Sequence, residues 1–107
     1  MAYLGEFEQL ILLSILRLQP EAYGVSILTE IQKTAGRTAL RPAVYVALRR
    51  LEEKGLVQSR MGDPRPERGG KARKYFEVQA DGLALLRESR EALLNMWEGL
   101  EPWFKKP

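Results

Sequence analysis

The 107-residue chain is 45% apolar and 29% charged with a net charge of +3, which suits one soluble globular domain with a single core. It has neither cysteine nor histidine, which excludes disulfides and thiolate metal sites and removes the usual general base near neutral pH. No apolar run is long enough to cross a membrane, and glutamates stand where a signal peptide would carry basic residues, so we expect a cytoplasmic protein without metal or cofactor.

The first predicted helix, Leu4–Leu18, is apolar on more than one face. A helix of this kind must be buried on two sides. Because so short a chain has few elements to cover both sides, the pattern favours a partner chain. A central core helix in a monomer is the alternative. The apolar residues are Phe7, Leu10, Ile11, Leu12, Leu13, Ile15, Leu16 and Leu18.

Two further helices are predicted before the middle of the chain. Pro20 ends the first helix, and the second runs from about Tyr23 to Ala35, with Gly36 as its left-handed cap. Pro42 suits the first turn of the third helix, because it fixes φ and lacks only a donor that would be unpaired there. Gly55 is expected to end the third helix.

The third helix has two different sides. Val44, Leu48 and Leu51 follow the i, i+4, i+7 spacing of a side that faces the core. The opposite side is basic and aromatic, which is the composition expected of a helix that enters the major groove of DNA. We expect this outward side to consist of Arg41, Pro42, Tyr45, Val46 and Arg49, with Arg50 nearer its edge.

A basic hairpin follows directly. Val57–Met61 and Arg73–Val78 alternate and are predicted to form two antiparallel strands. The 15 residues from Arg60 to Lys74 hold six Lys or Arg against two Asp or Glu, a charge of +4, while the remaining eleven basic and twelve acidic residues give −1. The net charge therefore lies in one loop after a helix. A solvated charged hairpin is the alternative to a DNA-binding wing.

The last predicted helix runs from Asp81 to about Glu101, and Pro102 is expected to end or bend it. Its apolar stripe has little left in a monomer to cover it, which favours two-fold pairing over folding back onto its own core. The stripe, and so the expected dimer interface, comprises Leu86, Leu93, Trp97, Leu100 and Phe104.

The order of elements predicts a mainly α fold with a small β-hairpin: a winged helix-turn-helix over residues 1–79 and a C-terminal dimerisation helix over 80–107. In a DNA-binding reading, Arg49 contacts a base or a phosphate, Tyr45 a phosphate or a thymine methyl, and Arg50 a phosphate. The wing would supply salt-dependent contacts to phosphates or the minor groove through Arg65, Arg68, Lys71 and Arg73.

The chain resembles the PadR family of transcriptional regulators over nearly its whole length. The resemblance is carried by LGEFEQLILLSIL (4–16), AYGVSI (22–27), VYVALRRLEEKGLV (44–57) and PERGGKARKYFEV (66–78). It departs from the family at Leu40–Pro42, where a serine and a glycine are usual, and at Gln79–Gly82, where Thr-Pro-x-Gly is usual.

The resemblance implies a dimeric bacterial repressor whose C-terminal helices contact the first helix of the partner. Two-fold pairing through the last helix would place two recognition helices about 34 Å apart, one turn of DNA, so we expect an inverted-repeat operator. The resemblance also implies a site for a flat aromatic ligand at the dimer interface, with Trp97 stacking on it. Met96 and Leu93 would lie beside Trp97, and Phe7 or Leu10 of the other chain opposite. A tryptophan on the apolar stripe of a helix more often only packs in the interface, and this is the alternative interpretation of Trp97.

Two other classes of function remain as alternatives. One is a winged helix that binds a protein and never DNA. The other is a small enzyme or ligand carrier, for which the candidates are few. The neighbouring carboxylates, Glu52 with Glu53 and Glu6 with Glu8, are interpreted as solvent-exposed helix residues. A phosphate-binding loop would follow a strand and precede a helix, whereas Gly69–Gly70 lies inside a hairpin. We therefore expect no catalytic residue.

Overall fold

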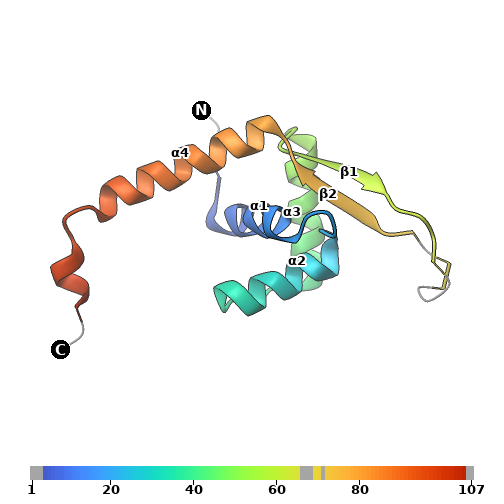
Figure 1. Cartoon of the computed structure of the whole chain (residues 1–107), viewed down its shortest axis with the longest axis horizontal. Coiled ribbons are helices and arrows are strands. Elements are labelled where there is room, and N and C mark those ends of the chain that lie inside the picture. The colour runs from blue at the N-terminus through green and yellow to red at the C-terminus, as the bar shows by residue number, and fades with distance from the viewer. Residues whose placement is uncertain (1–3, 66–68, 71, 106–107) are drawn as a thin grey trace.

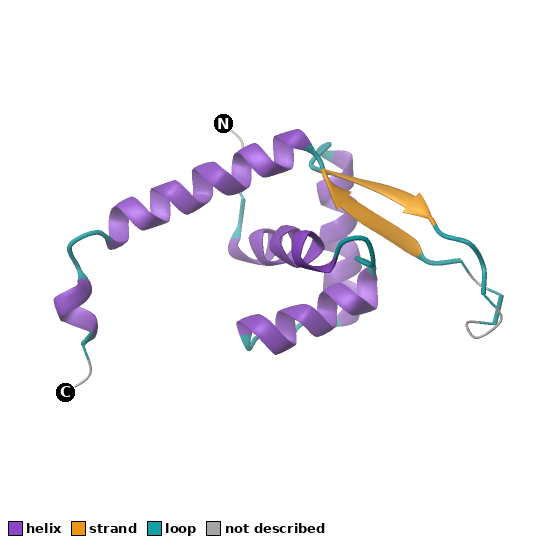
Figure 2. Ribbon diagram, in the orientation of Figure 1, coloured by secondary structure: helices purple, strands orange, loops and turns teal. Residues whose placement is uncertain are grey.

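The elements follow one another in the predicted order (Figure 1). The computed structural model describes residues 4–65, 69–70 and 72–105. The hairpin and the last long helix leave the helical body in opposite directions, so the chain is elongated, with extents of 55 × 35 × 22 Å (Figure 2). The elements are α1 (Glu6–Leu18), α2 (Gly24–Glu30), the π-helical η1 (Ile31–Ala35), α3 (Arg41–Glu53), β1 (Val57–Met61), β2 (Lys74–Val78), α4 (Ala80–Trp97) and the 3₁₀ helix η3 (Glu101–Phe104).

Local chemistry explains where the first helices begin and end. The backbone N–H of Gly5 donates to the Glu8 carboxylate (3.1 Å), and acidic residues in the first turn of α1 suit the positive helix end. The predicted second helix is one continuous rod whose last turn, η1, is wider than an α-helix. It ends at Gly36 with φ 66°, the predicted left-handed cap.

The core is formed mainly by the three N-terminal helices. Val44, Leu48 and Leu51 of α3 are buried, as predicted from their spacing. On α1, the chain itself buries only one of the two apolar sides. Leu13 and Leu16 remain 45% and 42% exposed on the other side. The fully buried large side chains are Leu4, Ile11, Leu12, Ile15, Ile27, Ile31, Val44, Leu48 and Leu51.

The hairpin is held to the body through the outer edge of β2. β1 and β2 pair antiparallel, with Ser59 opposite Phe76. The backbone N–H of Phe76 donates to the carbonyl of Ala22 (2.9 Å), and its carbonyl accepts from the Gln19 side chain (2.7 Å). The loop between α1 and α2 therefore covers part of an edge that would otherwise be an open template for another strand.

The start of α4 is docked closely on the turn after α3. The N–H of Gln79 donates to the carbonyl of Leu56 (2.8 Å). Two turns further, Leu86 packs into the chain's own core and is only 9% exposed. This corrects one part of the expected dimer stripe, because the monomer already covers Leu86. From Arg90 to its end, every residue of α4 is exposed.

The end of α4 also differs from expectation. The helix ends at Trp97, not near Glu101, because Gly99 takes a left-handed conformation with φ 82°. Pro102 lies inside the short η3 helix instead of ending α4. The turn folds the tail back, so that the rings of Trp97 and Phe104 meet with centroids 4.9 Å apart.

Gly82→Ala is expected to destabilise the protein by about 1–3 kcal/mol. A Cβ at Gly82 would stand 2.5 Å from the Leu56 carbonyl oxygen, a backbone atom that cannot move without shifting the α3–β1 turn. Urea unfolding followed by circular dichroism measures the loss. Gly5→Ala is the matched control, since its Cβ would meet only Glu8, at 3.9 Å. Equal midpoints for the two variants would contradict the prediction.

Candidate DNA-binding surface

The outward side of α3 is exposed as predicted. The buried side of the helix holds it on α1 and α2, while Arg41, Tyr45, Val46, Arg49 and Arg50 are all exposed. Pro42 occupies the first turn, and Leu40 before it is extended (φ −87°, ψ 141°) without a side-chain cap. The departure from the family pattern at Leu40–Pro42 thus leaves the helix intact, because proline provides the entry that a capping residue usually provides.

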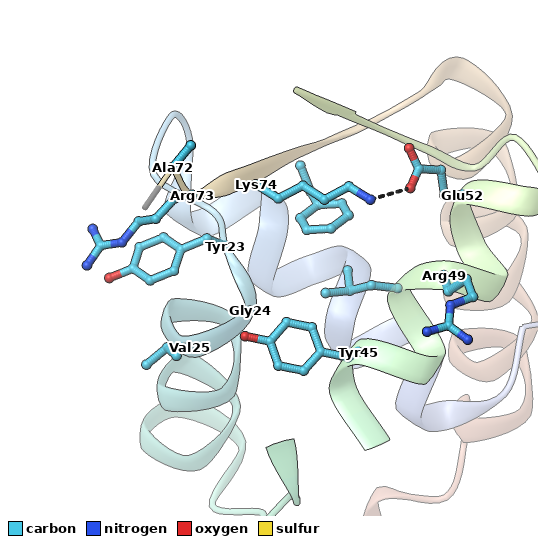
Figure 3. Close-up of a pocket in the computed structure, with 11 residues that line it drawn as sticks. Tyr23, Gly24, Val25, Tyr45, Arg49, Glu52, Ala72, Arg73 and Lys74 are labelled. Carbon is cyan, nitrogen blue, oxygen red and sulfur yellow. Dashed lines mark ion pairs between the residues drawn. The ribbon is translucent and has the colours of Figure 1, made fainter. Parts of the chain in front are cut away.

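Tyr45 lies against the start of α2 (Figure 3). A Cβ placed on Gly24 would come within 2.6 Å of the Tyr45 hydroxyl oxygen, so only glycine allows this approach. The ring is still 44% exposed. Tyr45 therefore packs α3 on α2 and also presents part of its ring outward, a dual position that helical spacing alone did not reveal.

The aromatic rings and two arginines form a stack at the base of the hairpin. The Arg73 guanidinium lies 4.1 Å from the centroid of the Tyr23 ring, and that of Arg60 lies 4.8 Å from the Tyr75 ring. The two tyrosine rings meet edge to face with centroids 5.9 Å apart. Arg73 was predicted to contact DNA, and in the chain alone its guanidinium packs on the Tyr23 ring. Such contacts are worth about 0.5–1 kcal/mol at exposed sites.

A groove of about 450 Å³ joins the start of α2, α3 and β2 (Figure 3). It brings together three residues predicted separately for DNA binding, Tyr45, Arg49 and Arg73. Sequence reasoning missed its other polar residues, Tyr23, Glu52 and Lys74, because nothing in their spacing places a helix beside a strand. The full lining is Tyr23, Gly24, Val25, Tyr45, Leu48, Arg49, Glu52, Ala72, Arg73, Lys74 and Phe76.

One acidic side chain interrupts this basic surface. Glu52 accepts a hydrogen bond from the Ser59 hydroxyl (2.5 Å) and pairs with the Lys74 ammonium (3.4 Å). The Ser59 hydrogen bond, with the Lys74 charge adding to it, holds the pKa of Glu52 below its ordinary value against the opposing effect of burial. The carboxylate is therefore ionised at neutral pH.

The tip of the hairpin is only partly described. Arg68 and Lys71, which were predicted to contact phosphates, lie outside the described residues. Arg65 is exposed, and its carbonyl accepts from the N–H of Gly70 (3.1 Å) across the turn. Gly69 and Gly70 both have positive φ, 66° and 79°, which only glycine adopts without strain.

The residues predicted for the dimer and the ligand lie on α1, on α4 and around η3. Leu93, Met96, Trp97, Leu100 and Phe104 are all exposed along α4 and η3. On α1, Phe7 and Leu10 are half-buried, and Leu10 lines a groove of about 250 Å³ together with the exposed Leu13 and Leu16. Figure 1 shows the last turns of α4 and the following η3 extending away from α1.

Metal sites and membrane-spanning helices are both absent from the described part of the chain. No group of three or more carboxylate, histidine or cysteine side chains there is placed to hold a metal ion. None of the described helices is long and apolar enough to cross a membrane.

Two helices joined by a turn, the second with an exposed basic side and followed by a basic hairpin, define the winged helix-turn-helix class. The family model for the PadR-like transcriptional regulators matches residues 12–88. The chain belongs to this family, whose members are DNA-binding regulators of transcription and not enzymes. The expectation drawn from the sequence motifs is thereby confirmed.

Solved structures of the same family share this fold. A PadR family regulator from Eggerthella lenta is 26% identical, with a TM-score of 0.69 over 95% of this chain and 88% of the other. A PadR-like regulator from Bacillus cereus is 21% identical, with a TM-score of 0.73 over 94% and 93%. A PadR family regulator from Clostridium difficile is 20% identical, with a TM-score of 0.72 over 94% and 100%. Among curated proteins, none matches this sequence.

Proposed function

We propose that this protein is a homodimeric repressor of the bacterial cytoplasm, which binds an inverted-repeat operator and is released by a small aromatic ligand. The observation that carries the DNA-binding part is the groove that is lined by Tyr45 and Arg49 of α3 and by Arg73 of the hairpin. In this arrangement α3 enters the major groove, and Arg49 contacts a base edge. Arg41, Val46 and Arg50 flank it on α3, and Arg65, Arg68, Lys71 and Arg73 contact phosphates.

The uncovered apolar surface supports the homodimer. Leu93 and Trp97 are 54% and 53% exposed on α4, and Leu13 and Leu16 line an apolar groove on α1. Apolar patches of this kind on a single chain mark interaction surfaces. In the proposed division, residues 1–79 bind DNA and 80–107 hold the dimer. Two-fold pairing would set two α3 helices about 34 Å apart, one turn of DNA.

The proposed ligand site lies at that dimer interface. Trp97 would stack on a flat aromatic ligand, with Met96 and Leu93 beside it and Phe7 and Leu10 of the partner subunit opposite. The exposed ring of Trp97, already packed on Phe104, offers an aromatic surface where the two copies would meet. Release of DNA requires that the ligand bind more tightly to a dimer with a different spacing of the α3 helices.

The test is a fluorescence anisotropy titration of the protein on the duplex upstream of its own gene and on a shuffled duplex, at about 0.15 M salt. We expect tight binding to the upstream duplex alone, with an affinity that falls as salt rises because counterions are released. Equal weak binding to both duplexes would mean that the operator lies elsewhere. Absence of binding to any DNA would make the protein an interaction module.

A further inference from the structure

A single carboxylate connects α3 to both strands of the hairpin. Glu52 lies in the last turn of α3, and its two oxygens have different partners. One accepts from the Ser59 hydroxyl on β1 (2.5 Å). The other faces the Lys74 ammonium on β2 (3.4 Å), as Figure 3 shows. Two attachment points on different strands restrict rotation of the hairpin about α3, which one contact would not do.

The position of Glu52 relates it to the DNA-binding side chains. It follows Arg49 by three residues, so the two lie on the same side of α3, and both line the groove. A negative charge on a DNA-binding surface repels phosphates, and an acidic residue in the last helical turn also opposes the helix dipole. These unfavourable effects are offset only locally, by the charge-assisted contacts with Ser59 and Lys74.

We propose that Glu52 is a positioning residue, which fixes the angle between the hairpin and α3 so that base contacts and phosphate contacts form together. This inference rests on the proposed function, because it concerns how the same surface discriminates between sequences. With the angle fixed, only a duplex that satisfies both α3 and the hairpin is bound tightly. Without it, the hairpin finds phosphates on any duplex independently of α3.

The consequence is a change in discrimination rather than in overall affinity. Glu52→Gln removes the ion pair and weakens the bond to Ser59. We expect the ratio of affinities for specific and shuffled DNA to fall about fivefold or more, because the ion pair is lost and the Ser59 hydroxyl then donates to a neutral group. Affinity for shuffled DNA should stay equal or rise, because a negative charge has been removed.

Two further variants distinguish the loss of positioning in Glu52→Gln from the loss of its negative charge. Glu53→Gln removes the same charge from the next residue, which is exposed and has no side-chain hydrogen bond or ion pair in the described part of the chain. Ser59→Ala removes one attachment point without changing any charge. The duplexes are those that the wild-type protein selects from a random-sequence library, and their shuffled counterparts. Thermal unfolding of each variant checks that the fold is kept.

Loss of discrimination in Glu52→Gln and Ser59→Ala, with Glu53→Gln like wild type, would support the proposal. Equal behaviour of Glu52→Gln and Glu53→Gln would overturn it, and so would full discrimination in Ser59→Ala.

Hydrogen exchange on the DNA-free proteins tests the positioning role without DNA, since we expect faster exchange of the hairpin amides in Glu52→Gln. Unchanged exchange would overturn the inference even if DNA is bound. Failure of the wild type to select any duplex would instead refute the proposed function.

Discussion

Arg49→Ala is expected to weaken binding to the operator by about tenfold or more, with a much smaller loss on a shuffled duplex. Arg49 lies on the exposed side of α3, where it lines the groove beside Tyr45. Arginine contacts guanine through two hydrogen bonds at once, and these form only on the right sequence. The loss therefore falls on specific binding. Anisotropy titrations on the two duplexes at the same salt concentration measure it.

Arg87→Ala is the matched control for this experiment. It removes the same charge from an exposed position of α4 that belongs neither to the DNA-binding surface nor to the proposed dimer stripe. Any general effect of lowering the net charge should therefore be the same in both variants. Equal losses on operator and shuffled DNA in Arg49→Ala would make Arg49 a phosphate contact and contradict the base-reading role.

The architecture could be predicted because each element has its own local signal. The spacing of Val44, Leu48 and Leu51 predicts which side of α3 is buried, and Pro42 and Gly36 mark where the helices begin and end. Signals of this kind depend only on residues close in the sequence, so the tertiary fold does not change them. The end of α4 was misplaced because two signals compete there. Gly99 ends the helix before Pro102 can act.

The contacts within the site were less predictable. The fit of Tyr45 against Gly24 joins residues 21 positions apart, and the bond from Ser59 to Glu52 joins a strand to a helix. Hydrophobic periodicity assigns a side chain to a side of its element, but it does not say which side chain of another element lies opposite. Arg73 shows the limit most clearly. Its charge predicts a contact with DNA, whereas its position over the Tyr23 ring depends on packing between separate elements and has no signal in the sequence.

Leu86 shows a related limit for the dimer stripe. The i+7 spacing from Leu86 to Leu93 is correct for one side of a helix, yet the first residue is buried in the monomer and the second is exposed. The difference arises because α4 touches the body only near its start, where Gly82 allows a close approach to Leu56. Periodicity gives a direction around the helix axis. It does not say how far along that axis the body reaches.

A double variant, Leu93→Asp with Trp97→Asp, is expected to raise the dissociation constant of the proposed dimer about a thousandfold or more. Burying an unpaired charge costs several kcal/mol at each position. Both side chains are more than half exposed in the single chain, so the fold of the monomer should be kept. Sedimentation equilibrium measures the association, and circular dichroism measures the helix content.

Asn95→Asp is the matched control, since it adds a negative charge at an exposed polar position of the same helix. We expect it to remain a dimer. The double variant should also lose affinity for the inverted repeat far more than for one half-site, because two α3 helices no longer bind together. A double variant that still sediments as a dimer would place the interface elsewhere. The exposed side of α1, with Leu13 and Leu16, would then be the next surface to change.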